Sequence, residues 1–156
     1  MDAALLRRIE DLIYDYAHCI DDDRLEEWPD FFTDDCRYEI ISRESHAKNL
    51  PVGIMYCDSK GMLADRILAL RTANIYEPHF YRHLLSAIRI GEEQDGVIPV
   101  TTSYTVIRTM QEGDISVFSS GKYLDKVVLE NGTPRFKERI VVCDSSRVDT
   151  LMVIPI

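Results

Sequence analysis

Glu77, His79 and His83 are the residues whose types and spacing most directly suggest chemistry. Two imidazoles and a carboxylate make up the facial triad that holds non-haem iron. Residues four apart lie side by side on a helix, but on a strand they are roughly 13 Å apart at about 3.3 Å per residue. Residues 80–90 are rich in aromatic and aliphatic side chains, which favours a strand. The spacing therefore predicts that His79 and His83 share no metal ion, and that they have structural or pocket-lining roles.

A second set of residues could perform acid–base chemistry. Asp22, Tyr14, Tyr16 and His83 could supply a general acid and a general base if they point into one cavity. Each also has a plainer role, because Asp22 can cap a helix, the tyrosines can fill the core and His83 can be a hydrogen-bonded core histidine. We keep the catalytic set as the alternative and expect no catalytic, cofactor-binding or metal-binding residue in this chain.

The cysteines offer neither a zinc site nor a redox pair. No two of them form a C-x-x-C motif, and we expect all to be reduced and mostly buried. The sequence also lacks a glycine-rich phosphate loop and a G-x-S-x-G motif. The four cysteines are Cys19, Cys36, Cys57 and Cys143.

Length and charge limit the possible classes. A chain of 156 residues fits one domain, residues 1–156, with a core of ordinary size. The formal net charge of −9 argues against nucleic acid or an anionic membrane as a partner. No secretion signal and no apolar run of bilayer length are present, so we expect a cytoplasmic protein.

Hydrophobic periodicity predicts helices in the first half of the chain. Residues 3–20 have a strong apolar stripe, and a short helix should follow, because Asp23 and Glu26 have capping-box spacing. A third helical pattern starts after Asp58 or Ser59, either of which could cap it, and ends before Pro78.

Alternating and apolar runs predict one strand early in the chain and most strands in the second half. A strand near residues 36–40 precedes an irregular loop at 42–57 with one short strand, and Gly121 suggests a bulge. Short turns between the later strands favour an antiparallel meander. Its four strands are Phe80 to Ile90, Val97 to Met110, Ile115 to Leu129 and Phe136 to Cys143.

This order of elements predicts an α+β fold in which N-terminal helices pack on the concave face of a curved antiparallel sheet. It resembles the cone-shaped nuclear-transport-factor-2-like fold, also called cystatin-like or SnoaL-like. Such a fold serves isomerases, dehydratases and non-catalytic subunits alike, so function has to be argued from the residues.

Several longer segments point to one family. They include the element W-P-x-x-F-x-D-D, which starts at Trp28, and the element G-M-L-x-D-R, which starts at Gly61. With them the chain resembles the small, or β, subunits of bacterial Rieske-type aromatic-ring-hydroxylating oxygenases, such as those for terephthalate, salicylate or anthranilate. The matching segments are LEEWPDFFTDDCRYEI (25–40), SRESHAKNLP (42–51), SKGMLADR (59–66), NIYEPHFYRHLLS (74–86), SGKYLDKVV and RIVVCDS.

The resemblance implies a non-catalytic structural subunit of a dioxygenase that acts on an aromatic carboxylic acid. It implies a heterohexamer of three α and three β subunits, with the Rieske 2Fe–2S cluster and the non-haem iron on α. The residues agree, because no cysteine here is followed by histidine at the C-x-H or C-x-x-H spacing of a Rieske centre. A free-standing SnoaL-like isomerase or dehydratase, and a ligand-binding cone without chemistry, remain the alternatives.

Two surfaces could serve assembly. The apolar tail Leu151–Ile156 must be covered either by its own sheet or by a neighbouring subunit, and both are open at this stage. The convex face of the meander is the other candidate, because the helices should occupy the concave face. A three-fold ring needs two different contact surfaces on each subunit.

Overall fold

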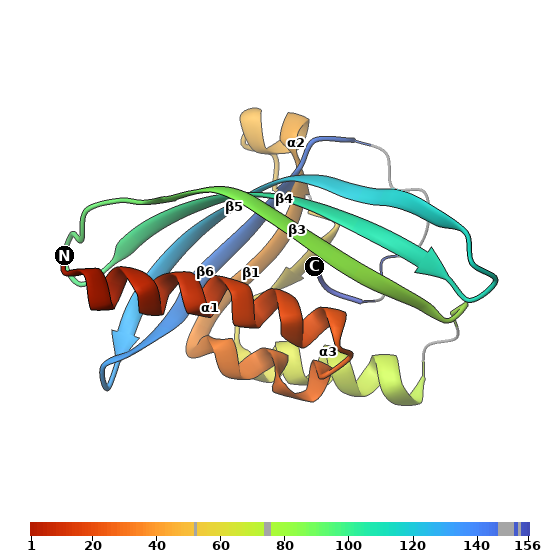
Figure 1. Ribbon diagram of the computed structural model, residues 1–156, viewed down its shortest axis with the longest axis horizontal. Coiled ribbons are helices and arrows are strands. Elements are labelled where there is room, and N and C mark those ends of the chain that lie inside the picture. Colours follow the sequence, from red (N-terminus) through yellow and green to blue (C-terminus); the bar gives the residue numbers. More distant parts are fainter. Residues whose placement is uncertain (52, 74–75, 147–151, 153) are drawn as a thin grey trace.

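The computed structural model describes residues 1–156 except 52, 74–75, 147–151 and 153. Within this range six strands form one sheet that curves over a layer of helices (Figure 1). In chain order the elements are α1 (Ala3–Asp21), the 3-10 helix η1 (Leu25–Phe31), β1 (Phe32–Ser42), α2 (Arg43–Ala47), β2 (Met55–Cys57), α3 (Lys60–Thr72), β3 (His79–Ile90), β4 (Ile98–Met110), β5 (Ile115–Glu130) and β6 (Thr133–Cys143).

Helices α1 and α3 form where the apolar stripes predict them, and both start at side-chain caps. A carboxylate oxygen of Asp2 accepts a hydrogen bond from the Leu5 N–H at 2.8 Å. At α3 the cap is Ser59, one of the two predicted candidates, and its hydroxyl accepts from the Met62 N–H at 3.1 Å. Each such cap stabilises its helix by about 1 kcal/mol.

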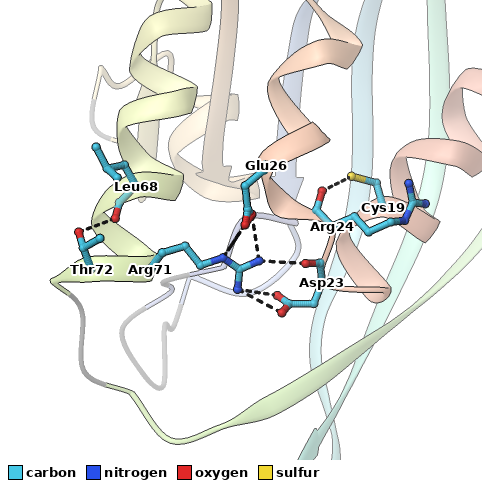
Figure 2. Close-up of polar contacts among 7 residues, drawn as sticks. All are labelled: Cys19, Asp23, Arg24, Glu26, Leu68, Arg71 and Thr72. Carbon is cyan, nitrogen blue, oxygen red and sulfur yellow. Dashed lines mark hydrogen bonds and ion pairs between the residues drawn. The ribbon is translucent and has the colours of Figure 1, made fainter.

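The predicted capping box at Asp23 and Glu26 is wrong. Helix η1 starts without a side-chain cap, and both carboxylates instead bind Arg71 of α3 (Figure 2). Arg71 Nε lies 2.8 Å from Glu26 Oε1, and Nη1 lies 3.0 Å from Asp23 Oδ1. These bonds tie the end of α1, η1 and α3 together. Two acids three residues apart fit a capping box and a shared distant cation equally well, so the spacing alone does not distinguish them.

Strands β3 to β6 form the predicted meander, with the strand order β2-β1-β6-β5-β4-β3. Strand β1 extends it by pairing with β6 in parallel, and β2 pairs antiparallel with β1. The sheet is therefore antiparallel except for this one pair among the described strands. The parallel pair escapes sequence analysis because its two strands lie far apart in the chain, with no turn between them to set their direction.

The predicted bulge at Gly121 is wrong. Gly121 pairs in register with Tyr104 on one side and Cys143 on the other, and the β4–β5 register shifts at Phe118 instead. A Cβ on Gly121 would lie 2.0 Å from the main-chain oxygen of Val142. Glycine is thus required here because two backbones approach closely, not because the strand bends.

The helices form two unequal layers. Figure 1 shows α1 and α3 under the concave face of the sheet and the short α2 on the opposite side. The predicted loop at residues 42–57 therefore contains α2 as well as the expected short strand, β2. No helix among the described residues is long and apolar enough to cross a bilayer. Most of the core lies between α1, η1, α3 and the concave face, around the aromatic side chains of Tyr16, Trp28, Phe32, Tyr38 and Phe136.

The apolar tail belongs to this core. Met152, Ile154 and Ile156 are all buried by the chain itself and are at most 7 % exposed. Their burial inside one subunit contributes stability of roughly 1.5–3 kcal/mol for each fully buried side chain. Of the two alternatives for the tail, cover by its own core is confirmed for these residues, and cover by a neighbour is wrong. Residues 151 and 153 lie outside the described part of the chain.

Candidate functional site

The structure keeps Glu77, His79 and His83 apart. His79 and His83 lie on β3 as predicted. His79 Nδ1 lies 2.8 Å from the main-chain oxygen of Glu77, and Glu77 itself is exposed. His83 is buried and binds a different carboxylate. Among the described residues, no three His, Cys, Asp or Glu side chains are grouped so that they could hold a metal ion. These three residues therefore do not form a facial triad.

The predicted acid–base set does not converge either. Tyr14 is 40 % exposed, and Asp22 lies in the exposed C-cap of α1. Tyr16 is buried, and its hydroxyl donates a hydrogen bond to the main-chain oxygen of Ile156 at 3.0 Å. Only His83 has the carboxylate partner that acid–base chemistry would need, and that partner is Asp21.

Asp21 and His83 form a buried pair between the end of α1 and the middle of β3. His83 Nδ1 lies 2.6 Å from Asp21 Oδ1, and the His83 main-chain N–H donates to Asp21 Oδ2 at 2.8 Å. An ionised carboxylate only accepts hydrogen bonds, so the Nδ1–H of His83 is the donor and Asp21 Oδ1 is the acceptor. The His83 side chain is 0 % exposed and the Asp21 side chain is 4 % exposed. This arrangement fixes the imidazole and joins α1 to the sheet.

Of the two residues, Asp21 borders a hollow and His83 does not. Beside Asp21 lies a hollow of about 230 Å³ that is also lined by Tyr76, His79 and Tyr81, but not by His83. His83 Nε2 is buried and has no hydrogen-bond partner among the described residues. A general base needs its free nitrogen within hydrogen-bond reach of a substrate proton. The pair resembles half of an acid–base site, but its reactive atom is enclosed.

The sequence analysis named Asp22 as the candidate carboxylate, whereas in the structure Asp21 is the carboxylate that binds His83. A signal for Asp21 was present, because Ile9, Ile13, Ala17 and Asp21 follow one another at spacings of four. Residues four apart share a helix face, and the first three are buried against the sheet. Extending that face by one step would have placed Asp21 inward and Asp22 outward.

The interior of the cone is filled by a second buried pair, Asp125 and Arg139. Arg139 Nε and Nη2 donate to the two carboxylate oxygens of Asp125 at 2.8 and 2.9 Å, and both side chains are 0 % exposed. The guanidinium lies 4.3, 3.8 and 4.1 Å from the ring centroids of Tyr16, Tyr123 and Phe136. Stacking on aromatic rings and a bidentate carboxylate are the contacts that suit a buried arginine. Around this pair, the space between the helices and the concave face is occupied by the chain's own side chains.

Burial keeps the interior hydroxyls protonated. It raises the pKa of Tyr16 to about 12, although the charge of Arg139 opposes the rise. Burial also raises the pKa of Tyr38 and of Tyr123 well above the ordinary value. Tyr38 donates its hydroxyl to the main-chain oxygen of Ile156 at 2.7 Å, so the tail is held by hydrogen bonds as well as by packing. The Tyr16 and Tyr38 phenols are therefore hydrogen-bond donors to the tail, whereas the Tyr123 hydroxyl is buried without a hydrogen-bond partner among the described residues.

The cysteines are buried and unpaired, as predicted. Burial raises the pKa of Cys19 and of Cys36 to about 11, and it also raises the pKa of Cys57. A thiol that stays protonated at neutral pH is a poor nucleophile and a poor metal ligand. A Rieske centre needs two cysteines and two histidines at one place, and the cysteines here lie in the core away from such a set.

Unlike the interior, the convex face of the sheet is accessible to a partner. A groove of about 550 Å³ lies between the segment that follows β1 and the sheet, and its lining includes Arg37, His46, Leu50, Tyr56 and Ile140. Further along the sheet, β3, β4 and β5 present an open surface that we call the outer array. Its fifteen residues are Phe80, Arg82, Leu84, Ser86 and Arg89 on β3, Thr101, Ser103, Thr105, Ile107 and Thr109 on β4, and Ile115, Val117, Ser120, Lys122 and Leu124 on β5.

Comparison with known families decides the relationship. Residues 16–150 match the model of the family described as ring hydroxylating beta subunit. The chain belongs to this family. The resemblance that the sequence segments suggested is thereby confirmed, and so is the fold class.

Named relatives in this β-subunit family are similar along most of their length. The small subunit of anthranilate 1,2-dioxygenase from Burkholderia cepacia is 45 % identical over 141 residues, which cover 90 % of this chain and 88 % of the relative. The terminal oxygenase component subunit beta 1 of terephthalate 1,2-dioxygenase from Comamonas sp. is 47 % identical, with 90 % and 92 % covered.

Solved structures show the same fold. A β subunit assigned to an aromatic-ring-hydroxylating dioxygenase of Novosphingobium aromaticivorans matches with a TM-score of 0.88 and 43 % identity, covering 99 % of this chain and 100 % of that one. A protein of the same organism, described as a scytalone dehydratase, matches with a TM-score of 0.70 and 20 % identity, covering 91 % and 85 %. The second likeness concerns the fold alone, because function depends on residues that a shared fold does not specify.

Proposed function

We propose that this chain is the non-catalytic β subunit of a dioxygenase that hydroxylates an aromatic carboxylic acid, and that it supports assembly of a hexamer of three α and three β subunits. The observation that carries the proposal is the family match over residues 16–150. Relatives named as subunits of anthranilate and terephthalate dioxygenases, at 45 % and 47 % identity, support an aromatic acid as the substrate class. In this proposal the Rieske cluster and the non-haem iron lie on α.

The closed interior supports a structural role over the alternative of an isomerase or dehydratase. The buried Asp125–Arg139 pair and the tail lie in the cone, and His83 Nε2 is buried and does not line the hollow beside Asp21. General acid–base catalysis requires a substrate within reach of the base. Reduced, unpaired cysteines are also consistent with the cytoplasm, where we place the protein.

The proposal is tested by co-expressing the chain with an α chain that carries C-x-H and C-x-x-H motifs, preferably from an adjacent gene. We expect the two to co-purify, with all iron bound by α, and the complex to oxidise an aromatic acid such as anthranilate or terephthalate when electrons are supplied. A chain that binds no such α chain, or that alone converts a dehydratase substrate in a manner abolished by His83→Ala, would contradict it.

A further inference from the structure

The outer array differs from the rest of the chain in charge. It contains three cations, Arg82, Arg89 and Lys122, and no carboxylate, although the chain has a formal net charge of −9. None of the three cations forms an ion pair within the part of the chain that the structure describes. Unpaired cations concentrated on one face attract an acidic partner.

The same surface is unusually apolar for one exposed to water. Phe80, Leu84, Ile115 and Val117 are 66, 55, 70 and 65 % exposed. They lie in neighbouring rows, because Phe80 and Ile115 flank Thr109, and Arg82 and Val117 flank Ile107. An apolar patch of this kind beside polar residues marks a site of protein contact. Arginine and large apolar side chains are also enriched where interfaces form.

The acidic counterpart lies within the chain itself. Residues 1–35 hold 12 of the 27 acidic residues and three of the 18 basic ones, so they account for the whole net charge. On the solvent side of α1, Asp11, Asp15 and Asp22 follow one another with exposed Tyr14 and His18 beside them. The cations Arg7 and Arg8 lie on the exposed surface about one turn before Asp11. Exposed contacts of Asp11 with Arg7 and of Asp22 with Arg24 are worth little and are easily exchanged. We call Asp11, Tyr14, Asp15 and Asp22 the α1 stripe.

The two surfaces also match in length. Asp11 and Asp22 are separated by about 17 Å at 1.5 Å per helical residue. Arg82 and Arg89 are separated by roughly 20 Å at about 3.3 Å per strand residue, with the register shift between Ser86 and Arg89 taken into account. The two arginines and the outermost acids of the α1 stripe therefore span a similar distance with opposite charge. The third cation, Lys122, lies on β5 in the row of Ser86 and Ser103, two strands from the arginines.

We propose that the outer array docks on the α1 stripe of a second copy of this chain. The array lies on the convex side of the sheet and α1 lies under the concave side (Figure 1), so the two surfaces are different and the contact is heterologous. Heterologous contacts close into rings when the rotation between copies allows it. This inference rests on the proposed function, because it supplies the contact between β subunits that the proposed hexamer requires.

The test reverses charges on each surface separately and then together. One variant carries Arg82→Glu with Lys122→Glu, a second carries Asp15→Lys with Asp22→Lys, and a third carries all four changes. A control reverses two exposed cations elsewhere, Lys137→Glu with Lys48→Glu, and of these Lys48 loses only an exposed contact with Glu44, which is worth little. All full-length chains are compared by sedimentation velocity at low and high salt, with thermal unfolding as the check on folding.

We expect each two-charge variant to self-associate at least tenfold more weakly than the unchanged chain, and the four-charge variant to regain association within a few-fold. The control should behave as the unchanged chain, and all melting temperatures should agree. The inference is overturned if the array variant still self-associates normally, or if the four-charge variant stays as weak as the two-charge variants.

Pull-down with the α chain separates this inference from the proposed function. An array variant that self-associates normally but no longer binds α would assign the array to α and overturn the inference, while the proposed function would stand. A chain that never binds α, but follows the charge pattern described above, would support the docking and contradict the proposed function.

Discussion

The two faces of β3, β4 and β5 are built from alternating residues of the same strands. They differ in whether their charged side chains are buried in ion pairs or exposed without them. On the inner face Asp125 is fully buried and bonded to Arg139. On the outer face its near neighbour Lys122 is exposed and has no ion pair among the described residues. A buried charge is tolerated only when it is paired, whereas water supports an unpaired one. The inner face is therefore complete by itself, and the outer face is left for a partner.

The largest expected effect concerns the buried pair. Changing Arg139 to methionine leaves the Asp125 carboxylate buried without its partner, which should lower the free energy of unfolding by about 3–5 kcal/mol. Urea denaturation followed by circular dichroism measures it. Arg135→Met, on the outer side of the same strand, is the matched control and should change stability by less than about 0.5 kcal/mol.

A double change sharpens this test. Asp125→Leu combined with Arg139→Met removes both charges, so it should recover much of the stability that Arg139→Met loses. If Arg139→Met were as stable as the unchanged chain, the Asp125–Arg139 pair would not stabilise the inner face.

The next effect compares one isoleucine on each face. Ile156 is 0 % exposed in the core and Ile115 is 70 % exposed in the outer array. Ile156→Ala should destabilise the isolated chain by about 2–5 kcal/mol, because it leaves a cavity. Ile115→Ala should leave that stability unchanged and weaken self-association instead. Equal effects of the two changes on chemical denaturation would remove the distinction between the faces.

Alkaline pH should lower the free energy of unfolding, because it ionises a tyrosine on the inner face. Folding raises the pKa of Tyr16 from 10.0 to about 12, so the folded state holds this proton more tightly than the unfolded state. That contribution to stability is complete below pH 10 and is lost as the pH rises to about 12, a change of roughly 2.7 kcal/mol for two pKa units. Denaturation curves at pH 9 to 11.5 measure it, and Tyr16→Phe should make the dependence less steep. A stability that is constant over this range would contradict the prediction.

The smallest effect concerns the Asp21–His83 pair. His83→Ala removes the ring hydrogen bond and leaves Asp21 with one partner fewer, so stability should fall by about 1–3 kcal/mol. His79→Ala, four residues away and partly exposed, is the control and should cost less. Turnover per assembled oxygenase should be unchanged in both variants. A large loss of turnover in intact assemblies, with iron content unchanged, would show that His83 takes part in the chemistry.

Much of the fold was predictable because it depends on short-range patterns. The stripe of α1, the cap at Ser59 and the four strands of the meander are encoded by residues within a few positions of one another. The strand predicted around His79 and His83 was also correct, and it kept the two imidazoles from being read as ligands of one metal ion. The family was recognisable from contiguous segments for the same reason, and the match over residues 16–150 confirms it.

By itself, then, the sequence determined the elements, their order and the family, because each is expressed in neighbouring residues. The tertiary structure alone decided that Asp21 and not Asp22 meets His83, and that Asp23 and Glu26 bind Arg71. It alone decided that β1 runs parallel to β6 and that the tail enters the core. Each of these depends on contacts between residues 45 to 140 positions apart in the chain. Over such separations, a shift of one residue along a helix or a reversal of a strand gives a side chain a different partner.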